Sequence, residues 1–383
     1  MTMDASPRFS VLRSRATETH NNLREEILAA LESIIFDSYH NSFTIRADLE
    51  AAFATEVAAK FAVAAHSGTI GLFIALRACD IGPGDEVITV ANSDISTTGA
   101  ISQCGATPVL CDVFEDDYTI NSDLVEALIT SKTRAILPVD LHGHPANVKA
   151  LRPIADQHGL KIVEDAALAT GARDYSQPVG RFADAAMFSF APFKPLGSAG
   201  NGAMVVTDDD DIHEELRLLT GYGYNPAGDV RSGYQDYSAE GYNVPLDGLQ
   251  AALLLVKLPR LREWTEKRRA IAAALEAGLA GSAARSPRFR PESAPTFRSY
   301  AIRTAHQDEL HQGLRAAGIE AVIHYAPPIH HYSVYAAGLP GADNLPVTEM
   351  LARQYVNLPV TPELTADEVN YMIETTRNLL QNM

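Results

Sequence analysis

The stretch that decides the fold is RAILPVDLHGHPANVKALRPIADQHGLKIVED, residues 134–165. Its two ends, Arg134–Val139 and Leu160–Glu164, predict strands, and Val148–His158 between them predicts a helix. A strand, a helix and a second strand within about thirty residues form the unit from which parallel sheets are built. This stretch therefore predicts an α/β protein.

The same alternation continues on both sides of this stretch. Apolar residues at helical spacing over Leu23–Ile34 and Leu49–Phe61 predict an N-terminal helical segment, and another helix follows Ser67-Gly68-Thr69. Further strands are expected at Glu86–Val90, Pro108–Asp112, Ala185–Phe190 and Ala203–Thr207. Strands separated by helices imply right-handed crossovers and a mostly parallel sheet, and we expect residues 1–257 to form this large domain.

The pattern changes after about residue 209. GYGYNPAGDVRSGYQDYSAEGYN (221–243) has no clear period, and we expect an extended loop with a functional or subunit-bridging role. A helical region from Leu246, interrupted by Pro259, is expected to join this domain to a smaller one. Residues 258–383 predict that smaller α+β domain, with elements at Tyr300–Arg303 (strand), Asp308–Ala317 (helix) and Glu320–His324 (strand) before two final helices.

Composition and charge exclude several classes of protein. The chain has 383 residues, 46% of them hydrophobic and 21% charged, as in ordinary globular proteins. With 31 basic and 48 acidic residues, the net charge of −17 disfavours nonspecific binding to nucleic acid or to an anionic membrane. Neither a signal peptide nor an apolar run long enough to span a bilayer is present in the sequence.

The three cysteines and the histidines give two further expectations. Cys79, Cys104 and Cys111 have no CxxC spacing, which indicates reduced thiols in a cytoplasmic protein. His142 and His144 in LHGHP do not match a defined zinc motif, even with Asp140, His330 and His331 added. We therefore expect no metal site.

Two short motifs place ligand-binding groups beside expected strands and helices. Ser67-Gly68-Thr69 leads directly into a helix, whose free N–H groups and positive dipole end suit a phosphate, although such residues are more often plain N-caps. Asp165, in IVEDAALATGA (162–172), ends a core strand, where α/β sheets place ligand groups. A carboxylate there would keep a pyridine nitrogen protonated, unless Glu164 or Asp165 merely caps the next helix.

The third motif is MFSFAPFKPLGSAGNGAMVVT (187–207), which contains a lysine between a strand and a Gly-rich turn. This residue, Lys194, is flanked by Phe190 and Phe193. Desolvation lowers the pKa of a lysine and favours imine formation with a carbonyl. Ser189, five residues earlier, could meet a phosphate. If the loop faced outward, Lys194 would be an ordinary solvated lysine.

The order of these motifs resembles that of a known family. SGT, EDAA-x-A-x-GA, FSF-x-x-x-K-x-LG, and GYN followed by LQAA-x-L-x-x-KL, resemble the DegT/DnrJ/EryC1/StrS aminotransferases. The resemblance runs from about Leu28 to the C-terminus and includes GPGDEVI (82–88), GATPVLCDV (105–113) and HYAPPIH (324–330). It implies a fold-type I transferase dependent on pyridoxal phosphate (PLP), with a large, mostly parallel-sheet domain and a smaller C-terminal α+β domain.

The resemblance also implies roles for individual residues. Lys194 would hold the cofactor as a Schiff base and carry protons to the substrate carbon, and Asp165 would pair with the pyridine nitrogen. Asn243 would reach the cofactor phosphate of the neighbouring subunit, which implies a homodimer with shared active sites. Tyr325 and His330 would face the sugar. The remaining cofactor-binding positions would be Ser67, Gly68, Thr69, Asp94, Leu168 and Ser189.

At several positions the chain departs from the family pattern. Leu168 stands where a hydrogen-bonding residue near the cofactor O3′ is common, and Asp94, in VANSDIST, stands where an aromatic ring packs on the pyridine. Thr170 replaces a common histidine, and Pro245 replaces an arginine. We expect Asp94 to meet the hydroxyl groups of an unusual substrate, unless it simply caps the helix that begins at Ile95.

The expected function is transfer of an amino group from an amino acid, glutamate or glutamine, to a keto-sugar, in particular a nucleotide-linked one, in amino-sugar biosynthesis. A keto-cyclitol is the alternative acceptor. A PLP-dependent sugar dehydratase is disfavoured, because dehydratases of this family carry histidine in place of the lysine. A catalytically silent sugar-binding relative is opposed by the presence of both Lys194 and Asp165.

Overall fold

The central feature of the computed structural model, which describes residues 9–37, 41–224 and 236–383, is a seven-stranded sheet of order β1-β9-β8-β5-β4-β2-β3. β9 pairs antiparallel with both of its neighbours, while the other neighbouring pairs are parallel. The predicted mostly parallel sheet is confirmed. Its strands are β1 (Phe61–Ala65), β2 (Glu86–Val90), β3 (Thr107–Cys111), β4 (Thr133–Ile136), β5 (Lys161–Asp165), β8 (Ala185–Ser189) and β9 (Ala203–Thr207).

The unit β4-α7-β5 shows why the local sequence folds as it does. The side chain of Asn147 caps α7 (Val148–His158) by accepting a hydrogen bond from the Ala150 amide at 3.1 Å. At the other end Gly159 takes a left-handed conformation (φ 64°), which a residue without Cβ adopts without strain. The predicted helix is confirmed, and it ends where β5 must begin.

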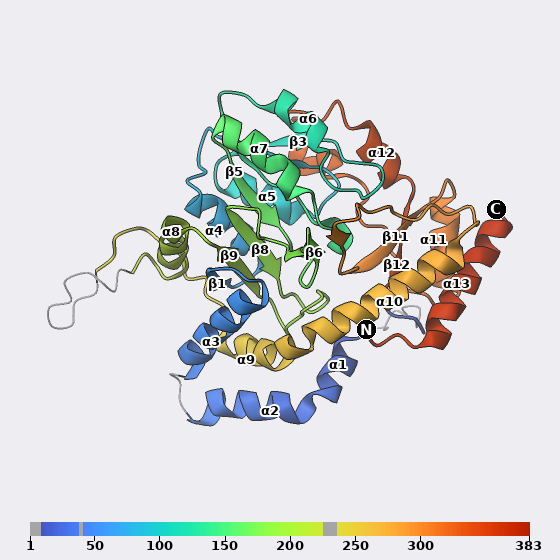
Figure 1. Cartoon of the computed structure of the whole chain (residues 1–383), viewed down its shortest axis with the longest axis horizontal. Coiled ribbons are helices and arrows are strands. Elements are labelled where there is room, and N and C mark those ends of the chain that lie inside the picture. The colour runs from blue at the N-terminus through green and yellow to red at the C-terminus, as the bar shows by residue number, and fades with distance from the viewer. Residues whose placement is uncertain (1–8, 38–40, 225–235) are drawn as a thin grey trace, which may run out of the picture.

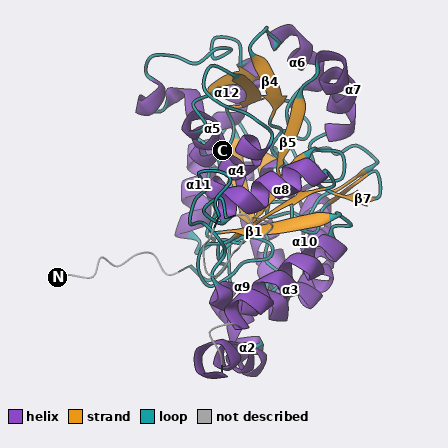
Figure 2. Ribbon diagram, turned by 90° about the vertical axis from the view of Figure 1, so that its left-hand side faces the viewer, coloured by secondary structure: helices purple, strands orange, loops and turns teal. Residues whose placement is uncertain are grey.

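Two core clusters hold helices against the sheet. One packs α4 (Gly68–Ala78), α5 (Ile95–Gln103), α7 and α8 (Asp210–Thr220) against it. The other packs α3 (Asn41–Glu56) and α9 (Gly248–Lys257) against β1, β8 and β9, with Phe53 in edge contact with Phe188 at 5.2 Å between ring centroids. In Figures 1 and 2, α3 and α9 lie together below the sheet, with α2 (Arg24–Glu32) beneath them.

A third core cluster belongs to the C-terminal region, at the right of Figure 1. There α10 (Leu261–Leu279), α11 (Gln307–Ala316) and α13 (Ala366–Gln381) pack on an antiparallel pair, β11 (Ser299–Arg303) and β12 (Tyr355–Pro359). Helices α9 and α10 are joined by a 3-10 turn at Leu258–Arg260, which contains Pro259. The division between residues 257 and 258 falls at the end of α9 and stays a prediction.

Short elements complete the described chain. They include α1 (Ala16–Asn22), a π-helical turn at Ser33–Asp37, α6 (Ser122–Val125), α12 (Pro346–Ala352) and a small sheet of β10 (Ser293–Ala294), β6 (Arg173–Asp174) and β7 (Gln177–Pro178). None of the helices in the described ranges is both long and apolar enough to cross a membrane. As predicted, the three cysteines are buried free thiols.

Some details of the predicted elements are wrong. Phe61 begins β1 and does not continue the helix before it. The predicted strand Glu320–His324 is not formed, and within this range Val322 alone makes a bridge, to Asn357. Within the predicted loop, residues 225–235 lie outside the described residues, and bridges join Gly221 to Asn243 and Tyr224 to Tyr237. The two final helices are confirmed as α12 and α13, whereas helix α8 and strand β12 were not predicted.

Candidate active site

A cavity of about 220 Å³ lies at the carboxyl ends of β5 and β8. These strands are parallel neighbours, with Asp165 paired to Met187, so the residues that end them meet at one edge of the sheet. The cavity brings together most of the residues that the sequence predicts for the site: Ser67, Gly68, Thr69, Asp94, Asp165, Leu168, Ser189, Lys194 and Tyr325.

At one wall of the cavity, the first turn of α4 lies against Ser189. Ser67 is the N-cap of α4, since its hydroxyl accepts a hydrogen bond from the Ile70 amide at 3.4 Å. A Cβ atom on Gly68 would lie 3.2 Å from Ser189 Oγ, so glycine keeps this space open. Free amides at a helix start, beside the hydroxyls of Ser67, Thr69 and Ser189, make a set of donors that fits a phosphate.

Asp165 lies at the base of the cavity and is 4% exposed. Its Oδ2 accepts a hydrogen bond from Thr97 Oγ1 at 2.9 Å, and its Oδ1 accepts one from the Ala167 amide at 3.2 Å. Burial raises the pKa of this carboxyl group, while the two hydrogen bonds and the nearby Lys194 oppose that rise. The residues that follow form turns, so Asp165 caps no α-helix.

Lys194 lies in a turn after β8, where its amide donates to the Ala191 carbonyl at 2.9 Å. Burial lowers the pKa of its amino group to about 8; Asp165 opposes this shift and Arg298 adds to it. Of the two flanking aromatic residues, Phe190 is packed in the core, and Phe193 is exposed with its ring 5.6 Å from Lys194 Nζ. The lysine is therefore a half-buried residue of the cavity wall.

The two residues that depart from the family pattern both line the cavity. Asp94 is exposed, and its Oδ1 accepts hydrogen bonds from the amide and hydroxyl of Ser96 at 2.9 and 2.8 Å, which makes it the N-cap of α5. Asp94 therefore caps α5, as one of the two interpretations held, and it also lines the cavity. Leu168 offers no hydrogen-bonding side chain there. Burial raises the pKa of Tyr325, so its hydroxyl stays protonated at neutral pH.

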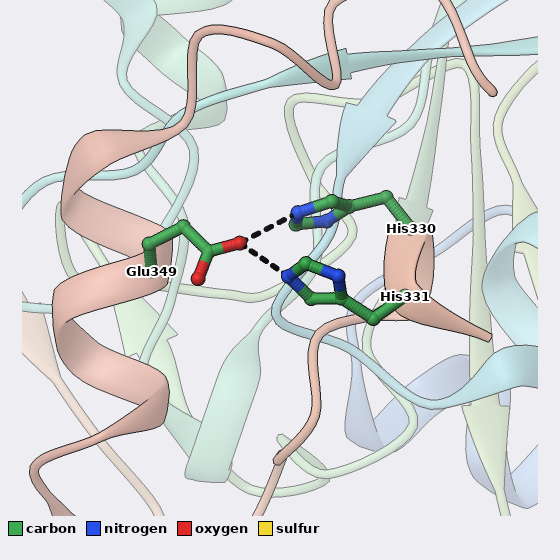
Figure 3. Close-up of side chains that lie close together, drawn as sticks. All are labelled: His330, His331 and Glu349. Atoms are coloured by element: carbon green, nitrogen blue, oxygen red, sulfur yellow. Dashed lines mark hydrogen bonds and ion pairs between the residues drawn. The ribbon is translucent and has the colours of Figure 1, made fainter.

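Two predicted residues lie outside this cavity. Asn243 is exposed beside a second, open cavity that His66 and Arg46 also line. His330 points towards Glu349, with 2.8 Å between His330 Nε2 and Glu349 Oε1, and His331 contacts the same oxygen (Figure 3). The roles predicted for Asn243 and His330 stay predictions.

Among the described residues, the histidines of LHGHP and those of the loop at 330–331 lie in separate groups. His330, His331 and Glu349 form one group whose potential ligand atoms lie within 4.8 Å of one another. His142 lies elsewhere, with its Nδ1 3.2 Å from the side-chain amide of Asn357. Burial lowers the pKa of His142 and that of His144, to about 4 for the latter, so both are neutral at pH 7.

The sequence-based prediction missed several residues of the site. Thr97 and Ser93 continue the hydrogen-bonded chain from Asp165, with 2.8 Å between their hydroxyl oxygens. Asn201 also lines the cavity, and Arg298 lies close enough to lower the pKa of Lys194. The segment VANSDIST contains Ser93 and Thr97 and was a usable signal, whereas no motif surrounds Arg298.

The donor set beside Gly68, the buried carboxylate of Asp165 and the low-pKa lysine fit the phosphate, pyridine nitrogen and carbonyl of pyridoxal phosphate. Fold and cavity thus define a PLP-dependent enzyme of fold type I. A family model for the DegT/DnrJ/EryC1/StrS aminotransferase family matches residues 21–377. The chain belongs to this family, and it is a PLP-dependent aminotransferase.

Relatives and solved structures agree with this assignment. The chain is 40% identical over 375 residues to dTDP-3-amino-3,4,6-trideoxy-α-D-glucose transaminase of Streptomyces venezuelae, covering 97% of this chain and 96% of that protein. It is 36% identical to UDP-N-acetyl-3-dehydro-α-D-glucosamine 3-aminotransferase of Acidithiobacillus ferrooxidans, with 94% and 95% covered. The crystal structure of S. venezuelae DesV in complex with a ketimine intermediate matches with a TM-score of 0.90 and 37% identity, with 99% and 100% covered.

Proposed function

We propose that this enzyme transfers the amino group of glutamate or glutamine to a nucleotide-linked 3-keto-hexose in amino-sugar biosynthesis. The main support for amino-group transfer is that Lys194, Asp165 and the start of α4 line one cavity. The names of the two relatives described above place the amino group at C3 of a dTDP- or UDP-linked sugar. The nucleotides of these two relatives differ. We therefore propose the position of the keto group on the sugar and leave the identity of the nucleotide to experiment.

Bound pyridoxal phosphate would supply a carbonyl group for the amino group and a ring that accepts the electron pair released at the substrate carbon. Lys194 would move a proton to and from that carbon. With a pKa of about 8, roughly a tenth of its amino groups are unprotonated at pH 7, far more than for a solvated lysine. Gly68, Thr69 and Ser189 would hold the phosphate and thereby place the reacting carbon beside this amino group.

Asp165 would hold a proton on the pyridine nitrogen. The hydrogen bonds from Thr97 and Ala167 favour the ionised carboxylate, which burial alone would disfavour. A cationic ring nitrogen would favour ionisation further, because opposite charges interact strongly in a water-poor site. The ionised form is the one that the proposed role requires.

Substrate selection would involve Asp94 and Tyr325 at the cavity. Both hydrogen bonds of the α5 cap use Asp94 Oδ1, which leaves Oδ2 to accept a bond from a sugar hydroxyl. A carboxylate at this place also repels a diphosphate. We therefore infer that the hexose ring lies against Asp94 and that the diphosphate extends away from it.

We further propose that the enzyme is a cytoplasmic homodimer whose sites are shared. Asn243 is exposed and does not line the cavity of its own chain. Large apolar side chains are also exposed on the N-terminal helical segment, including Phe36 at 79% and Ile35 at 58%, as expected of a surface that a second subunit covers. Each subunit would then contribute its Asn243 to the active site of the other subunit.

Mixing two inactive variants tests the shared site. A hybrid of an Asn243→Ala subunit and a Lys194→Ala subunit contains one intact site, so activity should return after subunit exchange. Each variant mixed with itself is the control. Absence of recovery, once mass spectrometry has confirmed hybrid dimers, would show that Asn243 acts within its own chain or not at all.

The function itself is tested by separating the two half-reactions. The PLP-loaded enzyme is treated with glutamate or glutamine until the cofactor absorbance changes, freed of donor, and screened against dTDP- and UDP-linked 3-keto-hexoses, their 4-keto isomers and a keto-cyclitol. We expect a 3-keto-hexose to restore the absorbance of the parent enzyme. The Lys194→Ala variant, treated in the same way, should show no such recovery. Faster return with the keto-cyclitol would overturn the sugar assignment.

A further inference from the structure

Two buried arginines lie near Lys194 without an anionic partner. Arg298 precedes β11 and Arg268 belongs to α10, and they are 7% and 6% exposed. Among the residues that the structure describes, neither guanidinium forms an ion pair or a hydrogen bond, and the buried Nε atoms of both lack a partner. Arg298 instead lies over the ring of Phe193, at 5.7 Å.

These arginines border small cavities next to the main one. Arg298, Lys194 and Tyr325 line a cavity of about 30 Å³, and Arg268 lines a second of about 30 Å³ together with Arg298 and Lys194. Each has room for a group about the size of a carboxylate or of one or two waters. Since Lys194 lines the main cavity as well, a ligand could extend from it towards either guanidinium.

The charges of the groups around Arg298 do not neutralise its guanidinium. Burial lowers the pKa of Arg298 to about 10, with Arg268 and Arg13 adding to the effect, so it remains a cation at neutral pH. Burial lowers the pKa of His324 to about 4, and this histidine is therefore neutral. Tyr325 is neutral too, and Arg13 is paired with Glu320 at 3.2 Å.

Arg268 has one acidic neighbour, Glu363, which favours its charged form without making an ion pair. The carboxylate oxygens of Glu363 are bonded to the hydroxyls of Thr19 and Thr361. A buried guanidinium without a partner is unfavourable, because it has lost its water and gained no carboxylate in exchange. An anionic ligand that enters this space would supply the missing partner.

We infer that Arg298, with Arg268 behind it, binds the carboxylate of the amino-acid donor. This inference rests on the proposed function, because it presupposes such a donor. In an amino acid the α-carboxylate is bonded to the carbon that carries the amino group, so its binding site must lie beside Lys194. A guanidinium suits this role because it can donate two parallel hydrogen bonds to one carboxylate.

A diphosphate from the nucleotide-sugar is the other anion to consider. In a 3-keto-hexose the diphosphate is attached to C1, two carbons away from the reacting C3, and it is larger than either small cavity. The donor carboxylate is attached directly to the reacting carbon, and it is small enough for either cavity beside Arg298. The position of Arg298 therefore favours the donor, and the acceptor provides the comparison in the test.

The test compares Arg298→Gln with the parent and with Arg262→Gln, which removes an exposed arginine from the same helix as Arg268. Glutarate, a dicarboxylate without an amino group, is titrated calorimetrically into each PLP-loaded enzyme. Loss of a charge-assisted hydrogen-bonded pair should weaken its binding about 10- to 100-fold in Arg298→Gln and leave Arg262→Gln unchanged. Unchanged glutarate binding by Arg298→Gln would overturn the inference.

Half-reactions identify which substrate the arginine serves. Arg298→Gln should raise the apparent Kd for glutamate by a similar factor and leave the apparent Kd of the amine-form enzyme for its keto-sugar unaltered. An equal rise in the apparent Kd for the keto-sugar would assign Arg298 to the acceptor and overturn the inference. If the parent reacts with glutamate but with no keto-sugar, the proposed function fails while the glutarate result still stands.

Folding of the variant is checked independently. Removing an unpaired buried charge should not lower the thermal midpoint of the ligand-free protein, and the stabilisation that glutarate gives the parent should be absent. Should Arg298→Gln fail to fold, Arg298→Lys keeps the charge and loses the two-bond geometry. That variant should bind glutarate about tenfold more weakly, and parent-like binding by it would contradict the inference.

Discussion

Replacing Thr97 by valine removes a hydroxyl of the site without changing the shape of the side chain much. Thr97 is fully buried, and its Oγ1 lies 2.9 Å from Asp165 Oδ2 and 2.8 Å from Ser93 Oγ. Asp165 as a carboxylate can only accept, so Thr97 must donate to it, and Ser93 must donate to Thr97. Thr97 is therefore a positioning residue that favours the ionised form of Asp165.

The size of the effect follows from the kind of hydrogen bond lost. A hydrogen bond to a charged group contributes about 1.5–3 kcal/mol, and one pKa unit corresponds to about 1.4 kcal/mol. Because this bond is the largest influence that opposes the burial of Asp165, its loss should raise the pKa of that carboxyl by a further ~1–2 units. The raised pKa means that Asp165 takes up its proton at a higher pH.

The assay is the pH dependence of kcat/KM for the donor half-reaction. In the proposed role of Asp165, turnover requires its ionised form, so activity falls as the pH drops through its pKa, and in Thr97→Val the acidic limb should move to higher pH by about 1–2 units. Thr97→Ser keeps the hydroxyl and should keep the limb in place. A Thr97→Val profile that is lowered uniformly, with its acidic limb unmoved, would refute the reasoning.

Three further predictions concern other residues of the cavity. The rate at which apoenzyme captures pyridoxal phosphate should rise about tenfold per pH unit below a pH of about 8 and level off above it, because only unprotonated Lys194 reacts; levelling off near pH 10 would contradict the lowered pKa. Gly68→Ala should weaken cofactor binding in equilibrium dialysis by about tenfold, since its Cβ would crowd Ser189 Oγ, and Gly99→Ala, where a Cβ within α5 meets open space, is the control. Asp94→Phe should shift preference among keto-sugars, whereas Asp94→Asn, which can still cap α5, should shift it less; identical kinetics on every sugar would leave Asp94 as a helix cap alone.

The motifs predicted residues that lie at strand ends or helix starts. Asp165 and Ser189 could be placed because each ends a strand that periodicity identifies, and parallel strands end at one edge of a sheet. Gly68 could be placed because a cap and a glycine mark the start of a helix. Thr97 was missed because its partner is 68 positions away along the chain.

Local pattern failed where the structure depends on distant contacts. The region 320–324 has apolar residues of the kind found in strands, yet its neighbour β12 pairs with β11, and one bridge is all that Val322 makes. Asp94 could be interpreted as a cap or as a site residue, and the structure shows that it occupies both positions because α5 begins at the cavity. Two roles for one side chain are not distinguishable from the chain order alone.

The sequence by itself determined the α/β class and most of the order of strands and helices, since these follow from short-range periodicity. Its motifs, in a set order, gave the resemblance to a PLP-dependent family and named Lys194 and Asp165 as candidate site residues. The tertiary structure decided the environment of those residues. Burial lowers the pKa of Lys194 and raises that of Asp165, and Arg298, 104 positions later in the chain, adds to the shift of Lys194. Desolvation and charge proximity depend on what packs around a side chain in space, and such packing is contributed by residues far away in the chain.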